Sequence, residues 1–113
     1  MTDKPDINAE ILDRLFDVVE SRKGSDVDAS YTAKLLAAGT PKIAQKVGEE
    51  AIETVIEALA DKEGKIAEES ADLLYHLLVL WADKGVRPED VWSVLMDRFG
   101  ISGIDEKNVR GKG

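Results

Sequence analysis

Residues 71–82 read ADLLYHLLVLWA and are the most informative stretch of the chain for its fold. The only strongly polar side chains in this stretch are those of Asp72 and His76. On a helix with about 100° per residue, these two fall with Glu69 and Asp83 inside a polar stripe roughly 60° wide. Because the other sides are apolar, other helices must cover them. The stretch therefore predicts the central helix of an all-α bundle of four to five helices, which a homodimer would complete.

The polar side chains of this helix need partners. Burial of an unpaired carboxylate costs several kcal/mol, so Asp72 is expected to be protonated, ion-paired or bound to a metal ion. Lys34 and Lys46 are the candidate ion-pair partners. His76 follows one turn later and is expected to be a core histidine, bonded to Asp72 or to a backbone carbonyl.

Local signals place the remaining helices. Ser30 is a candidate N-cap for a short helix that Gly39 ends, and Thr40 with Pro41 has the pattern of an N-cap followed by a first-turn proline. The predicted helices cover residues 5–21, 31–38, 41–62, the segment after residue 64 up to 84, and 88–99. The expected core side of the third helix consists of Ile43, Ala44, Val47, Ala51, Val55 and Leu59.

Composition narrows the class of protein. The chain has 113 residues, of which 43% are hydrophobic and 34% charged, which fits a single globular domain over residues 1–113 with a flexible tail at 101–113. The absence of cysteine and the single histidine exclude thiolate and multi-histidine metal sites. A net charge of -8 argues against general nucleic-acid binding. The polar N-terminus and the lack of a membrane-length apolar run predict a cytoplasmic protein.

A second group of acids precedes the central helix. Residues 48–53 read GEEAIE, which places Glu49, Glu50 and Glu53 at spacings of three and four on one helix surface. Such a row is also typical of a solvated helix face. Together with Glu69 and Asp72 on the next helix, however, the row predicts a divalent-cation site, because Mg²⁺ and Mn²⁺ prefer oxygen ligands.

These motifs resemble a known family. The pair EEAIE (residues 49–53) and ESAD (69–72) is similar to the signature of the all-α, MazG-type nucleoside-triphosphate pyrophosphohydrolases. The longer runs SYTAKLLAAGTPKIAQKVGEEAIETV and EESADLLYHLLVLWADKGVRPEDVW closely resemble the phosphoribosyl-ATP pyrophosphatase family over residues 30–92.

The resemblance implies an activity and roles for particular residues. It implies Mg²⁺-dependent hydrolysis of phosphoribosyl-ATP to phosphoribosyl-AMP and pyrophosphate, the second step of histidine biosynthesis, by a homodimer. The implied metal ligands are Glu50, Glu53, Glu69 and Asp72. Glu49 and Glu50 are the implied catalytic carboxylates, with Glu49 either a further ligand or a base that orients water. The implied substrate-binding residues are Lys34, Lys46, Tyr31 and Thr32.

Two other functions remain open from the sequence. The same fold and metal would suit a house-cleaning pyrophosphatase that removes non-canonical nucleotides. A non-catalytic helical dimerisation module, in which the acids are structural, is the third interpretation.

Overall fold

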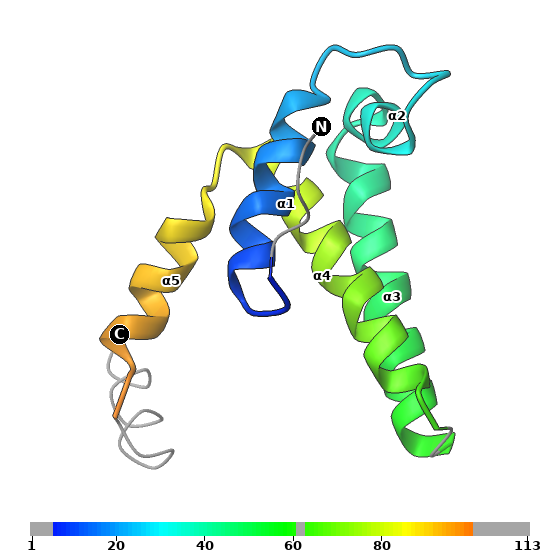
Figure 1. Cartoon of the computed structure of the whole chain (residues 1–113). Coiled ribbons are helices and arrows are strands. Elements are labelled where there is room, and N and C mark those ends of the chain that lie inside the picture. The colour runs from blue at the N-terminus through cyan, green and yellow to red at the C-terminus, as the bar shows by residue number, and fades with distance from the viewer. Residues whose placement is uncertain (1–5, 61–62, 101–113) are drawn as a thin grey trace.

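The computed structural model describes residues 6–60 and 63–100. Its helices are α1 (Glu10–Ser21), α2 (Tyr31–Ala38), α3 (Thr40–Ala60), α4 (Lys65–Lys84) and α5 (Pro88–Asp97). The described residues contain no strand, which confirms the all-α prediction (Figure 1). The predicted flexible tail lies outside the described residues. None of the helices described is both long and apolar enough to cross a bilayer.

The two longest helices, α3 and α4, lie side by side and form the main pairing of the fold (Figure 1). α1 packs against α4, α2 packs against α3 and α4, and α5 contacts α1 on the side of the molecule away from α3. The buried core lies at the end of the α3–α4 pair next to α1 and α2. It consists of Phe16, Val19, Leu35, Ile43, Leu78, Val79 and Ala82.

Most of the helix boundaries agree with the local signals. The Ser30 hydroxyl accepts a hydrogen bond from the Ala33 amide at 3.1 Å, so the predicted N-cap of α2 is confirmed. Gly39 has a φ of +94° and allows the chain to turn directly from α2 into α3. Gly85, with a φ of +72°, ends α4 as predicted.

Other boundaries differ from the prediction. α1 begins at Glu10 rather than at residue 5. The reason is that the Asn8 side chain accepts a hydrogen bond from the Glu10 backbone amide and stabilises a turn ahead of the helix. Thr40 is already the first residue of α3, and its hydroxyl donates to Asp83 on α4 at 2.5 Å instead of capping its own helix. α5 ends at Asp97, two residues earlier than expected.

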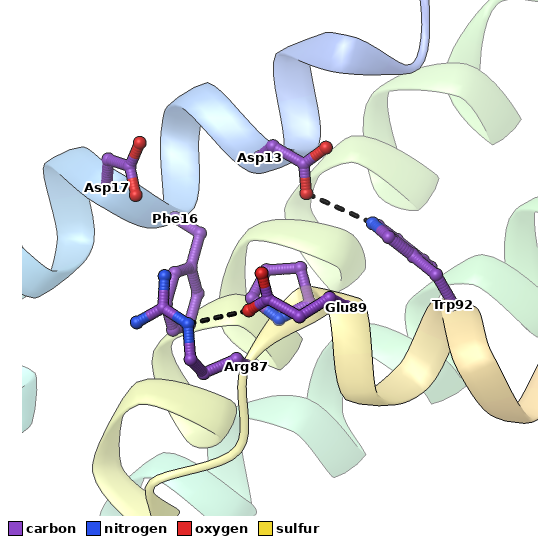
Figure 2. A pocket seen from close by; sticks show the side chains of 7 residues that line it. Asp13, Phe16, Asp17, Arg87, Glu89 and Trp92 are labelled. Atoms are coloured by element: carbon purple, nitrogen blue, oxygen red, sulfur yellow. Dashed lines mark hydrogen bonds and ion pairs between the residues drawn. The ribbon is translucent and has the colours of Figure 1, made fainter.

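Two polar contacts attach α5 to the rest of the fold (Figure 2). The Trp92 indole N–H donates to Asp13 of α1 at 3.0 Å. The Arg87 guanidinium lies 5.4 Å from the centre of the Phe16 ring, and its Nε donates to Glu89 at 2.6 Å. These contacts fix the start of α5 and leave its far end free of the core.

The predicted core side of α3 is only partly buried in the single chain. Ile43 is buried, but Ala44, Val55 and Leu59 are exposed, so the prediction was wrong for these three residues. The reason is that the second half of α3 extends beyond α1 and α2. There the exposed side chains recur at spacings of three, four and seven and make an apolar stripe of Ile52, Val55, Ile56 and Leu59.

The open shape agrees with this exposure. The Cα radius of gyration is 16.3 Å, whereas a compact domain of about 100 residues has one of about 13 Å. Ile66 and Leu74 of α4 are also exposed, as are Val94, Leu95, Met96 and Phe99 at the end of α5 and just beyond it. One chain therefore does not cover its own apolar helix faces.

Candidate metal and nucleotide site

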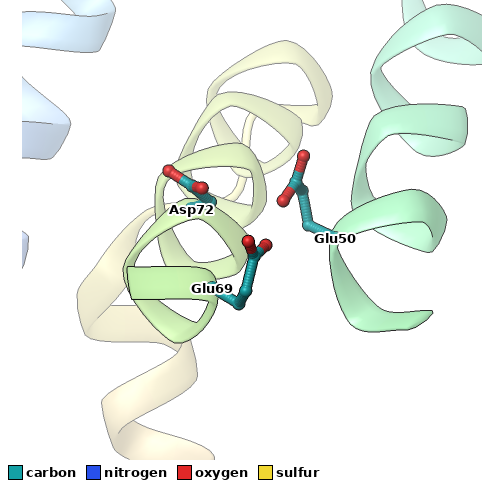
Figure 3. Close-up of side chains that lie close together, drawn as sticks. All are labelled: Glu50, Glu69 and Asp72. Atoms are coloured by element: carbon teal, nitrogen blue, oxygen red, sulfur yellow. The ribbon is translucent and has the colours of Figure 1, made fainter. Parts of the chain in front are cut away.

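Three carboxylates meet where α3 runs beside α4 (Figure 3). One oxygen from each of Glu50, Glu69 and Asp72 lies within 4.8 Å of the other two. Glu69 and Asp72 share a face of α4 because they are three residues apart, and the α3–α4 pairing brings Glu50 opposite to them. The structure thus brings together three of the four predicted metal ligands.

The electrostatics of this cluster fit a cation. Burial raises the pKa of the Glu69 carboxyl group, and a hydrogen bond with Glu50 and the charges of Glu50, Asp72 and Glu53 raise it further. Ionised carboxylates at this spacing repel one another, and a divalent cation among them would relieve the repulsion. Oxygen ligands of this kind suit Mg²⁺ or Mn²⁺.

The expected burial of Asp72 was wrong for the single chain. Asp72 is exposed, and Glu50 and Glu69 are half-buried. The reason is that the first half of α4 lies beyond the core, with α3 alone packed along it. The cost of burying the aspartate therefore does not explain its position, whereas the proximity of three like charges favours a cation at this place.

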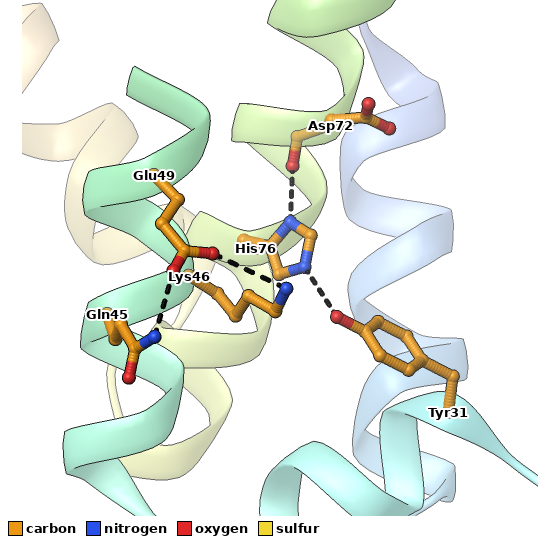
Figure 4. A network of polar contacts seen from close by, with 6 residues as sticks. All are labelled: Tyr31, Gln45, Lys46, Glu49, Asp72 and His76. Carbon is orange, nitrogen blue, oxygen red and sulfur yellow. Dashed lines mark hydrogen bonds and ion pairs between the residues drawn. The ribbon is translucent and has the colours of Figure 1, made fainter. Parts of the chain in front are cut away.

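The other two acids of α3 lie outside this three-residue group. Glu53 is exposed, although its charge contributes to the raised pKa of Glu69. Glu49 accepts a hydrogen bond from Gln45 at 2.8 Å and pairs with Lys46 at 3.4 Å (Figure 4). These contacts, with the Gln45 bond the largest cause, lower the pKa of Glu49 and favour its ionised form. Gln45 was not predicted, although its spacing of four from Glu49 was a usable signal.

The predicted ion pairs of Asp72 with lysine are not formed. Lys46 pairs with Glu49 on its own helix, and no ion pair joins Lys34 to Asp72 in the part of the chain that is described. Lys34 is exposed on α2. The dimerisation-module interpretation required one of these pairs, and the structure does not support it.

Every member of the α4 polar stripe meets a polar group from another helix. Glu69 and Asp72 face Glu50, Asp83 accepts from Thr40, and His76 bonds to Tyr31 at 3.1 Å. His76 is buried and its Nδ1 donates to the backbone carbonyl of Asp72 at 2.8 Å, so the prediction of a core histidine is confirmed.

The predicted substrate-binding residues Tyr31 and Thr32 lie at the start of α2. The Tyr31 ring stacks on Tyr75, and the Thr32 hydroxyl makes a short hydrogen bond with the Tyr75 hydroxyl. Burial is the main reason why the pKa of Tyr75 is raised. The Tyr31 hydroxyl is linked through the His76 ring to the backbone carbonyl of Asp72, and Asp72 lies one turn before His76 on α4 (Figure 4).

Comparison with known proteins identifies the family. The sequence profile of the family described as phosphoribosyl-ATP pyrophosphohydrolase matches residues 12–99. The chain belongs to this family. The match to the phosphoribosyl-ATP pyrophosphohydrolase family includes α2, α3, α4 and α5 and every residue of the carboxylate cluster.

Three family members are similar over nearly their whole length. A protein of Azospirillum brasilense named phosphoribosyl-ATP pyrophosphatase is 62% identical over 104 residues, which cover 92% of this chain and 94% of the relative. Proteins with the same name from Paramagnetospirillum magneticum and Rhodospirillum rubrum are 59% and 54% identical. These alignments cover 93% and 96% of this chain, and 96% and 92% of the respective relatives.

Proposed function

We propose that the chain hydrolyses the bond between the α and β phosphates of phosphoribosyl-ATP and releases phosphoribosyl-AMP and pyrophosphate, as a step of histidine biosynthesis. The observation that carries this proposal is the convergence of Glu50, Glu69 and Asp72 within 4.8 Å, in a chain whose family membership extends over residues 12–99. A protein with this activity needs a site that accepts a highly anionic substrate despite a net charge of -8.

A bound Mg²⁺ ion would reconcile the acidic site with the anionic substrate; Mn²⁺ is the alternative. We assign Glu50, Glu69 and Asp72 as its ligands, with Glu53, one turn from Glu50, as a fourth. When bound, the ion neutralises phosphate charge and lowers the pKa of a coordinated water molecule. The proximity of three carboxylates and the raised pKa of Glu69 support this assignment.

The neighbouring polar residues suit the handling of water and phosphate. We assign Glu49 to hold the attacking water, because its lowered pKa keeps the carboxylate ionised and therefore able to accept a hydrogen bond from water. Lys46, half-buried beside Glu49, is assigned to the phosphates, and Lys34 of α2 to the same group. We assign two roles to Glu50: it is a ligand of the metal ion, and it helps to orient the same water molecule.

A second copy of the chain would cover the apolar faces that one copy leaves exposed. We propose a homodimer in which the apolar stripe of α3 packs against its equivalent or against α4 of the other subunit. The stripe, the exposed α4 side chains and the large radius of gyration support this. A cytoplasmic location follows from the proposed role in biosynthesis.

The test is a substrate panel with and without Mg²⁺. We expect pyrophosphate release from phosphoribosyl-ATP that stops in excess EDTA, and a much lower kcat/KM for dCTP and dUTP. A preference of tenfold or more for the free deoxynucleotides, about 1.4 kcal/mol of transition-state binding, would identify a house-cleaning enzyme instead. Full activity in EDTA would remove the metal from the mechanism.

A further inference from the structure

The contact between His76 and Tyr31 joins residues that are 45 positions apart in the sequence. The His76 ring is only 6% exposed, with Nδ1 at 2.8 Å from the Asp72 carbonyl oxygen and Nε2 at 3.1 Å from the Tyr31 hydroxyl (Figure 4). A carbonyl oxygen can only accept a hydrogen bond, so Nδ1 carries the hydrogen. In the neutral ring, Nε2 is then an acceptor and the Tyr31 hydroxyl is the donor.

This direction decides what Tyr31 can offer to a ligand. A phenol has one hydrogen, and here His76 receives it, so the oxygen presents only lone pairs on its open side. Tyr31 as a whole residue is 51% exposed, and its hydrogen bond with the buried His76 is part-buried. Phosphate oxygens are acceptors and would gain nothing from such a hydroxyl. A ligand O–H or N–H group would complete the hydrogen bond.

We propose that His76 is a positioning residue, which holds the Tyr31 hydroxyl as a hydrogen-bond acceptor for a hydroxyl or amino group of the nucleotide part of the substrate. Tyr31 thus recognises the ribose or base end of the ligand and not a phosphate. The identity of the substrate in this inference rests on the proposed function. The hydrogen-bond direction rests on the two His76 contacts alone.

The hydrogen-bond direction is testable without any activity, because the chain has a single histidine. Long-range ¹H–¹⁵N spectra at about pH 8, where histidine side chains are commonly neutral, will show one imidazole. We expect a protonated Nδ1 and an unprotonated Nε2. In Tyr31→Phe the Nε2 resonance should shift because the donor is gone.

Tyr75→Phe is the matched control for these spectra. It removes a hydroxyl from the ring stacked on Tyr31, but that hydroxyl bonds to Thr32 and not to His76. We expect the same Nδ1–H tautomer in this variant. A wild-type ring protonated on Nε2, a doubly protonated ring, or an Nε2 resonance unchanged in Tyr31→Phe would each overturn the proposal.

Kinetics test which part of the ligand Tyr31 contacts. Tyr31→Phe should raise KM for phosphoribosyl-ATP and Ki for phosphoribosyl-AMP by about 2- to 12-fold, which corresponds to about 0.5–1.5 kcal/mol for one neutral hydrogen bond. The Ki for pyrophosphate and kcat should change by less than twofold. A comparable rise in the pyrophosphate Ki would place Tyr31 at the phosphates and refute the assignment.

The role of His76 is tested by pairing the two positions. His76→Leu should raise KM by a similar factor, and the double variant with Tyr31→Phe should be no worse than either single one. His76→Gln keeps an acceptor near the position of Nε2 and should recover part of the loss. If His76→Leu does not fold, the KM of His76→Gln provides the test of His76. Additive losses, or no recovery in His76→Gln, contradict a shared role.

If the wild type fails to hydrolyse phosphoribosyl-ATP, the proposed function is wrong. The spectra still decide the direction of the hydrogen bond between His76 and Tyr31 in that case.

Discussion

The exposed apolar stripe of α3 gives a quantitative prediction for self-association. Ile52 is 59% exposed in the single chain. Complete burial of an isoleucine side chain contributes about 1.5–3 kcal/mol, so covering the exposed part of Ile52 contributes about 0.9–1.8 kcal/mol per subunit. In a two-fold dimer the residue occurs twice, and Ile52→Ala should weaken the dimer by about 1.8–3.5 kcal/mol. The dimer dissociation constant should rise by about 20- to 400-fold.

Sedimentation velocity over a concentration series measures this constant directly. Ile11→Ala is the matched control, because Ile11 is 42% exposed but lies on α1, away from the stripe. Its dissociation constant should stay within about twofold of the wild type. A monomeric wild type at all concentrations, or equal weakening in the two variants, would refute the proposal that this stripe forms the interface.

Three further predictions concern the cluster and the core. Asp72→Asn should lower kcat/KM by about 100-fold or more while the far-ultraviolet circular dichroism stays helical, because a metal ligand is lost and no core contact is. In EDTA, thermal midpoints should fall as pH rises from 4.5 through the raised pKa of Glu69, since the folded state holds that proton more tightly than the unfolded state. Glu69→Gln should lack this fall in the thermal midpoint. It should also lack the stabilisation by Mg²⁺, which in the wild type reaches about 2.7 kcal/mol when the Mg²⁺ concentration is about one hundred times its dissociation constant. Urea denaturation should show that Ile43→Ala, at a fully buried position, loses about 2–5 kcal/mol of stability.

The sequence predicted much of the fold because helix ends depend on local chemistry. Ser30, Gly39, Gly85 and Pro88 each act within a few residues of their own position, through a cap, a positive φ or a missing amide hydrogen. The start of α1 was misplaced for a related reason. The Asn8 side chain competes for a backbone amide, and apolar periodicity does not register such a competition.

Burial was less predictable than helix position. The stripe of Ile52, Val55, Ile56 and Leu59 reads as a core face, and the single chain leaves it exposed. Periodicity shows that a face needs cover, but it does not say which chain provides that cover. The same limit explains why Asp72 was expected to be buried and is exposed.

Local sequence patterns were enough to predict the helices and the pairs of acids that share one helix face, such as Glu69 and Asp72, because a spacing of three fixes their relative direction. Tertiary packing was needed to bring Glu50 to that pair and to aim the Tyr31 hydroxyl at His76. These contacts depend on how α2, α3 and α4 pack, and packing is a property of the whole set of buried side chains and not of any local segment.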